Sequence, residues 1–167
     1  VADEAELTAA VAEAAAGDVI QLTDNITLSA TLSVPAEQSI TLDLNGHTLS
    51  VAADVDVIDN SGTLTVKNGT VAAKENTAAH FAVNNQESGV LTVEQDEGQE
   101  TKLIGRCGIQ NYGTVVINDG TVTSYNRNAI YTEAGSSTTI NGGQILASGG
   151  SSGMGRAVSA LGDVTIT

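Results

Sequence analysis

Basic side chains gather at one position of a repeated sequence pattern. In each copy they stand just before a pair made of a small and an apolar residue. The pairs are Ala82-Val83, Gly108-Ile109, Ala129-Ile130 and Ala157-Val158. The basic residue comes two positions before the first member of the pair, or one position before it in the last copy. These residues are His80, Arg106, Arg127 and Arg156. Guanidinium groups bind carboxylates and sulfates in a bidentate manner, so this basic stripe is a candidate glycan-binding surface. The alternative is that they are solvated corner side chains that pair locally with Glu75, Glu100 or Glu133.

Three tyrosines lie close in sequence to the basic stripe. They are Tyr112, Tyr125 and Tyr131. A tyrosine ring combines an apolar face with a polar tip, so it can stack on a sugar, but it can equally pack between neighbouring repeats. We include the three tyrosines among the candidate ligand-binding residues and leave both roles open.

The densest acidic cluster consists of Asp54, Asp56 and Asp59. Calcium prefers several oxygen ligands, so these carboxylates form a candidate Ca²⁺ site. No EF-hand or glycine-aspartate nonapeptide pattern accompanies them, and the alternative is a solvated acidic loop. No other cofactor is expected.

Two further residues, Cys107 and His47, have side chains that could act in catalysis. Cys107 is the sole cysteine and stands beside Gly108, which favours a small, semi-buried thiol over a nucleophile. His47 lies in the turn NGHTL and has no nearby base or nucleophile in the sequence. We therefore assign no catalytic residue.

An asparagine recurs two residues after the apolar member of successive small-apolar pairs. The column contains Asn60, Asn85 and Asn111, followed by Thr132. Stacked amides can bond to one another and to the turn backbone, so this column predicts a structural ladder.

These positions belong to a degenerate repeat of roughly two dozen residues. Each copy closes on a glycine and restarts with an alternating apolar strand, as in IDNSG-TLTVKNGTV and IQNYG-TVVINDGTV. The closing glycines are Gly62, Gly89, Gly113, Gly135 and Gly162. From Ile40 onward, each copy resolves into three short strands of period two, with Asn-Gly or Asp-Gly at a corner that needs positive φ.

Residues 1–17 differ from the rest, because Leu7, Ala10, Val11 and Ala14 recur with helical spacing. We predict a capping α-helix over 1–17 and a right-handed parallel β-helix of six or seven coils over 18–167. A β-sandwich is disfavoured, because the columns align in parallel and the repeat length is nearly constant. The chain is interpreted as a piece of a longer protein that continues beyond Thr167.

The charge and composition limit the possible partners. The formal net charge is −14, and the chain has only six Lys and Arg residues. Such a chain lacks the electrostatic attraction that nucleic acids and anionic membranes require. No stretch is long and apolar enough to predict insertion into a membrane.

The run GDVIQLTDNITLSATLSV, followed by SITLDLNGHTLS, resembles the opening of pectin-lyase-like right-handed β-helices. The similarity is closest to repeat-rich surface proteins of anaerobic gut bacteria and their phages. The resemblance covers essentially the whole chain and implies the fold. It leaves function open, because this fold serves lyases, hydrolases, adhesins and phage fibres.

Resemblance to the pectate lyases among them would imply several aspartates on neighbouring first strands and an arginine base. Here those strands offer only Asp43 and Glu94. We therefore expect a non-catalytic, extracellular module for adhesion or display, on a bacterial surface or a phage particle, whose partners are glycans or host-surface or particle proteins. The alternative is a domain that binds or cleaves polysaccharide as a lyase or hydrolase. A phage role predicts a symmetric oligomer, and a surface module predicts a monomer.

Overall fold

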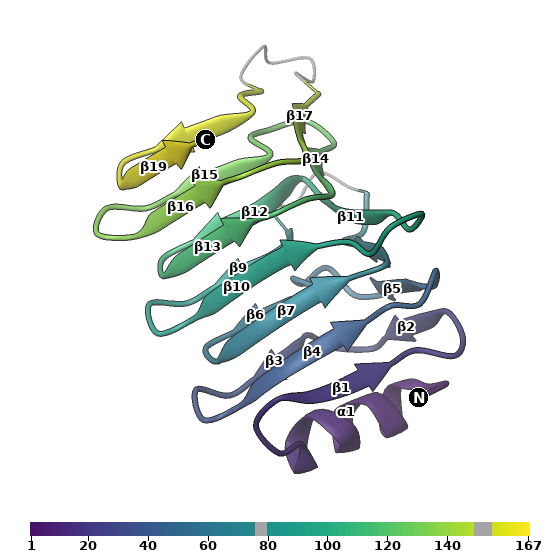
Figure 1. Ribbon diagram of the computed structural model, residues 1–167. Coiled ribbons are helices and arrows are strands. Elements are labelled where there is room, and N and C mark those ends of the chain that lie inside the picture. Colours follow the sequence, from purple (N-terminus) through teal and green to yellow (C-terminus); the bar gives the residue numbers. More distant parts are fainter. Residues whose placement is uncertain (76–79, 149–154) are drawn as a thin grey trace.

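The computed structural model describes residues 1–75, 80–148 and 155–167. Its strands form three parallel sheets, and the chain visits the sheets in the same order in every coil. Six complete coils stack along one axis, and β19 begins a seventh (Figure 1). The predicted parallel β-helix with six or seven coils is thus confirmed.

Sheet A contains seven strands. They are β1 (Asp18–Gln21), β4 (Ser39–Asp43), β7 (Thr63–Lys67), β10 (Val90–Glu94), β13 (Thr114–Ile117), β16 (Ser137–Ile140) and β19 (Asp163–Ile166). Sheet B contains β2 (Ile26–Leu28), β5 (Thr48–Val51), β8 (Gly69–Ala72), β11 (Thr101–Gly105), β14 (Thr121–Ser124) and β17 (Gln144–Ala147).

Sheet C contains β3 (Leu32–Val34), β6 (Ile58–Asn60), β9 (Phe81–Asn85), β12 (Cys107–Asn111), β15 (Ile130–Thr132) and β18 (Val158–Ala160). The three-strand coil is complete from β1 onward, one coil earlier than the sequence pattern indicates, because ITLSATLSV divides into β2 and β3.

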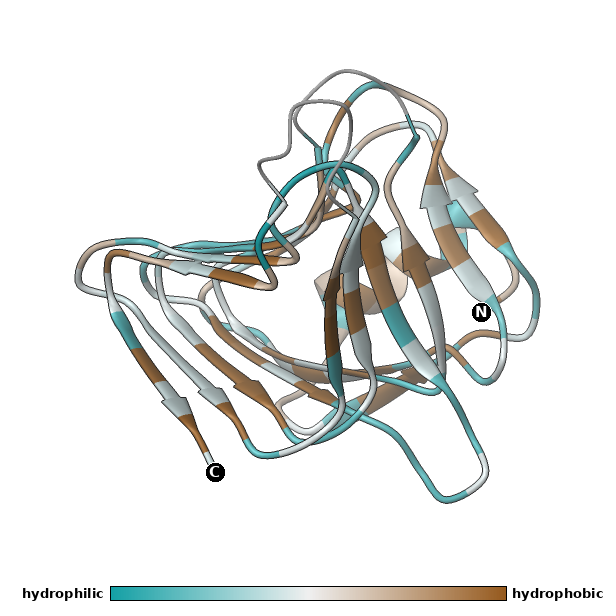
Figure 2. Ribbon diagram, turned by 90° about the horizontal axis from the view of Figure 1, so that it is seen from above, coloured by the Kyte–Doolittle hydropathy of each residue, from teal (hydrophilic) through white to brown (hydrophobic). Residues whose placement is uncertain are grey.

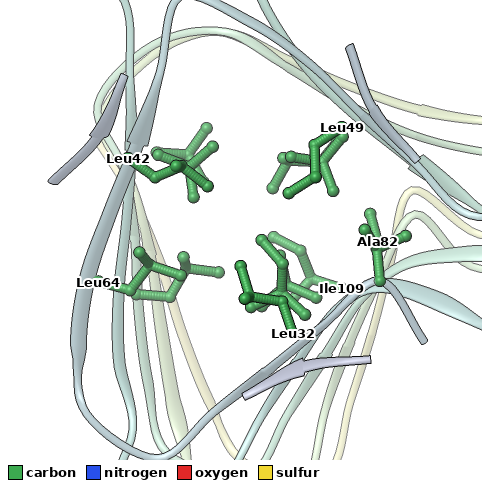
Figure 3. Close-up of a cluster of buried hydrophobic side chains, with 14 of the residues drawn as sticks. Leu32, Leu42, Leu49, Leu64, Ala82 and Ile109 are labelled. Atoms are coloured by element: carbon green, nitrogen blue, oxygen red, sulfur yellow. The ribbon is translucent and has the colours of Figure 1, made fainter. Parts of the chain in front are cut away.

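Alternation of apolar and polar residues places one face of every strand in a common interior. In sheet A, Leu42, Val66, Val93 and Ile117 lie in register, and each is at most 1% exposed. Viewed along the stack, the three sheets surround this interior (Figure 2). Leu42, Leu49 and Leu32, one from each sheet, point into it (Figure 3). The core is therefore a column of stacked aliphatic layers.

The N-terminal helix α1 (Glu4–Glu13) covers the first coil beside β1 (Figure 1). Asp3 Oδ1 accepts a hydrogen bond from Glu6 N at 2.9 Å, which caps the helix as its sequence predicts. Leu7 and Val11 are buried against the coil. Among the described residues, no helix is both long and apolar enough to cross a bilayer.

The helix ends four residues before the predicted boundary at residue 17. Ala14 already has extended dihedral angles, and Ala15 N donates to Asp18 Oδ2 at 2.9 Å. Gly17, with φ of 90°, then turns the chain into β1. This local Asp18 contact competes with helix continuation, and the Ala-rich composition does not reveal it.

Candidate functional site

The basic stripe is only partly aligned across coils. Arg106 N donates to His80 O at 3.0 Å, but Tyr125 N donates to Gly105 O at 2.7 Å, which places Tyr125 opposite Arg106 and Arg127 two residues further along the chain. Their side chains differ in environment. Arg106 is half-buried and its Nε donates to Asn126 Oδ1 at 3.2 Å, whereas Arg127 and Arg156 are exposed. The outward-facing positive charge therefore lies on the later coils.

His80 is directed toward sheet C instead of solvent. Its Nδ1 lies 3.9 Å from Asp56 Oδ1, and its side chain is only 17% exposed. Asp56 also accepts hydrogen bonds from Phe81 N at 2.8 Å and from Asn84 Nδ2 at 3.2 Å. Burial raises the pKa of Asp56, and these bonds oppose that rise. His80 thus belongs to a local polar cluster under the stripe.

A hollow of about 280 Å³ opens on the outer face of sheet C. We call it the Tyr131 hollow. It is lined by Phe81, Cys107, Gln110, Arg127, Asn128, Tyr131 and Glu133. The strands β9, β12 and β15, which run behind sheet A in Figure 1, bring these residues together from three successive coils.

The polar groups of the Tyr131 hollow are held in place by neighbouring strands. Gln110 pairs in register with Tyr131, and Gln110 Nε2 donates to Glu133 Oε1 at 2.7 Å. This bond fixes the carboxylate and leaves its remaining lone pairs as acceptors. The hollow therefore combines two aromatic rings, two amides, one cation and one anion.

A second, more open hollow of about 630 Å³ lies on the same side of the molecule. We call it the Tyr112 hollow. Its lining consists of Asp59, Ser61, Gln86, Glu87, Ser88 and Tyr112. The Tyr112 side chain is 41% exposed. Tyr125 lines neither hollow, and burial, with a smaller effect of Glu75, raises its pKa. The structure thus places two of the three candidate tyrosines in hollows.

The three aspartates of the predicted calcium cluster have separate partners. Asp54 Oδ1 lies 3.4 Å from Lys74 Nζ, Asp56 joins the His80 cluster, and Asp59 accepts a hydrogen bond from Gln86. Within residues 1–75, 80–148 and 155–167, no three or more His, Cys, Asp or Glu side chains are grouped to hold a metal ion. The structure therefore does not assemble them as a metal site.

The predicted asparagine ladder is present in the interior. Asn60 Nδ2 donates to Asn85 Oδ1 at 2.7 Å, and Asn85 Nδ2 donates to Asn111 Oδ1 at 2.9 Å. Thr138 of β16 continues the ladder, since Asn111 Nδ2 donates to Thr138 Oγ1 at 3.0 Å. The hydroxyl groups of Thr132 and Thr138 are in turn hydrogen-bonded to each other. The ladder holds the corner between sheets C and A.

The closing glycines lie where carbonyl groups crowd the corner. A Cβ atom on Gly113 would lie 2.3 Å from Gly89 O. In the fifth coil, however, Ser136 occupies this column, because Ser137 pairs with Thr114. Gly135 instead supplies a positive φ of 84° one residue earlier. The repeat spacing does not reveal this shift by one residue. A glycine in the crowded column and a glycine that supplies positive φ are both simply Gly in the sequence.

Four residues of the Tyr131 hollow were not candidates from sequence. Phe81, Gln110 and Asn128 carry no motif, and Glu133 was considered only as a partner for arginine. Phe81 is the only phenylalanine of the chain, and it faces outward at the start of its strand. Strict alternation would place Phe81 on the same face as Val83, so the sequence gives no signal for its place in the hollow.

Cys107 is 6% exposed, and burial raises the pKa of its thiol. The structure agrees with the expected semi-buried thiol, although the residue forms part of the hollow's wall. His47 is half-buried in its predicted turn, where its backbone N donates to Leu44 O at 2.8 Å.

Comparisons with protein-family models, with curated proteins and with solved structures give no match for this chain.

Proposed function

We propose that this chain is a non-catalytic β-helix module of an extracellular protein, on a bacterial surface or a phage particle, and that sheet C displays a glycan-binding face. The observation that carries the proposal is the Tyr131 hollow, where Phe81 and Tyr131 stand beside Arg127, Gln110 and Glu133. Sugars offer apolar C–H faces and hydroxyl groups, and this lining supplies a partner for each.

The rigid scaffold supports a binding role. Phe81, Cys107, Gln110 and Tyr131 lie on parallel strands whose interior side is a packed aliphatic column, and Glu133 directly follows β15. A preorganised surface loses little conformational entropy when a ligand binds. Adhesion or display needs such a surface and no moving parts.

The environment of the first-strand acid supports the non-catalytic part of the proposal. Asp43 is only 8% exposed, and it accepts hydrogen bonds from Gln21 Nε2, Asn45 N and Asn68 Nδ2 at 3.0–3.2 Å. A carboxylate with these partners serves the corner between sheets A and B. Glycoside hydrolysis instead needs two carboxyl groups that flank one bond, and Asp43 lines neither hollow.

A broad glycan array, probed with the intact chain in the presence and absence of Ca²⁺, tests the proposal. We expect saturable binding that Tyr131→Ala abolishes and that Tyr125→Ala, a substitution of the same kind outside both hollows, preserves. The best-bound glycan should remain intact after prolonged incubation. Silence on every glycan would overturn the binding role, and depolymerisation would overturn the non-catalytic one.

A further inference from the structure

The two hollows of sheet C are adjacent along the axis of the β-helix. Asp59, Asn84, Gln110 and Tyr131 pair in register as one column of successive coils. The Tyr112 hollow contains the first member of this column, and the Tyr131 hollow contains the last two. The hollows therefore share one face of the sheet.

A second column joins the hollows more closely. Tyr112 N donates to Asn85 O and Glu133 N donates to Asn111 O, so Gln86, Tyr112 and Glu133 occupy equivalent positions on three successive coils. Gln86 and Tyr112 line one hollow, and Glu133 lines the other. Tyr112 thus stands at the boundary between the two.

The combined length decides the size of ligand. The linings run from Asp59 on the second coil to Tyr131 on the fifth. Neighbouring parallel strands lie about 4.8 Å apart, so three such steps span about 14 Å. One sugar ring is shorter than this distance, whereas a short oligosaccharide covers it. A ligand that reaches from Tyr131 to Asp59 must therefore be a chain extended along the axis.

The charge of the face decides the chemical class. Three carboxylates, those of Asp59, Glu87 and Glu133, line the hollows, and Arg127 is the one cationic side chain among the lining residues. The whole chain carries a net charge of −14. A polyanionic glycan would meet repulsion at each step, whereas the hydroxyl groups of a neutral glycan can donate to these carboxylates.

From these observations we propose that sheet C binds a neutral, linear oligosaccharide that lies parallel to the helix axis and occupies both hollows. This inference rests on the proposed function and names its ligand class. Tyr131 and Glu133 on the fifth coil contact one end of the oligosaccharide, and Tyr112 on the fourth coil and Phe81 on the third flank its middle. Asp59 on the second coil accepts hydroxyl hydrogen bonds at the other end.

Calorimetric titration tests the inference with two series of ligands. Neutral linear glucans, mannans, xylans and galactans, from disaccharide to hexasaccharide, form one series, and oligogalacturonates form the other. We expect affinity for the preferred neutral chain to rise about tenfold or more with length, and oligogalacturonates to bind more weakly. Asp59→Ala, at the end of the face far from Tyr131, should lower hexasaccharide affinity about tenfold and leave the disaccharide unaffected. Tyr112→Ala, one coil from Tyr131, should weaken both, and Tyr131→Ala should abolish the binding of both.

Tyr125→Ala is the matched control, and circular dichroism checks that each variant is folded. Because Arg127 is exposed, Arg127→Ala provides a second test of the Tyr131 hollow that leaves the core intact. Equal affinity at every length, or a preference for oligogalacturonates, would overturn the inference and leave glycan binding standing. Failure of every glycan to bind would overturn the proposed function as well.

Discussion

Replacing Asn85 with alanine should remove the central rung of the asparagine ladder. The Asn85 amide is fully buried, and it accepts a hydrogen bond from Asn60 Nδ2 at 2.7 Å. It also donates to Asn111 Oδ1 at 2.9 Å, to Gly89 O at 3.0 Å and to Thr114 O at 3.1 Å. All four bonds are lost in the variant.

The magnitude follows from the number of bonds and from what remains. The two N–H groups of the Asn85 amide share three acceptors, so with the accepted bond they count as three hydrogen bonds. At about 1 kcal/mol net each, these set an upper value of about 3 kcal/mol. Part of this is recovered, since Asn60 Nδ2 still donates to Gly62 O and Asn111 Oδ1 still accepts from Gly113 N. We expect Asn85→Ala to lower the free energy of unfolding by about 2 kcal/mol.

The adjacent residue supplies the control. Asn84 faces outward, its Nδ2 makes one bond of 3.2 Å to Asp56, and its Oδ1 finds no partner. Asn84→Ala should therefore cost less than about 1 kcal/mol. Urea unfolding followed by circular dichroism measures both variants. Equal losses, or a loss below about 1 kcal/mol for Asn85→Ala, would refute the view that the ladder stabilises the corner.

Three further predictions concern the scaffold. Gly113→Ala should destabilise the chain by about 1–3 kcal/mol or more in urea unfolding, because the new Cβ would lie 2.3 Å from Gly89 O and 2.4 Å from Gln86 O, whereas Thr114→Ala on the exposed side should be nearly neutral. Leu7→Ala should lower the free energy of unfolding by about 2–5 kcal/mol, since Leu7 is the fully buried residue of the capping helix. It should also speed amide exchange in β1 more than in β13, and equal exchange in the two strands would contradict the capping role. Because burial raises the pKa of Asp56 above its unfolded value, its stabilising protonated form predominates at low pH, and stability is lost as pH rises through the raised pKa. Asp56→Asn should therefore gain stability relative to the parent chain as the pH rises from below the ordinary Asp pKa of 3.8 through the raised pKa, and a constant difference across this rise would show that Asp56 is not desolvated.

The sequence predicts the scaffold well, because a period of two and a repeated corner are local signals. The ladder of Asn60, Asn85 and Asn111 could be found for the same reason, since in-register stacking makes equivalent positions neighbours. The end of α1 could not be found, because it depends on one contact of Asp18 with the backbone of Ala15.

The candidate site was predicted only in part. Arg127, Tyr112 and Tyr131 have positions in the two hollows. The half-buried position of Arg106, whose Nε donates to Asn126 Oδ1, could not be read from its column. Gln110 lines the Tyr131 hollow from β12, where no recognisable motif marks it. Phe81 lines it from β9, where two consecutive buried residues, Ala82 and Val83, break the alternation. A hollow forms where outward side chains extend to different heights above the sheet. A repeat pattern does not encode these heights, so it cannot predict which side chains enclose a hollow.

The central claim is that sheet C binds a glycan at its two hollows. Chemical-shift mapping of the isotopically labelled chain tests it most directly, with the neutral hexasaccharide that binds most tightly as the titrant. We predict that the shifted amides cluster at residues 107–112 and 128–133, with smaller changes at 86–88 and none in sheet B. Shifts confined to sheet B or to α1 would contradict the claim.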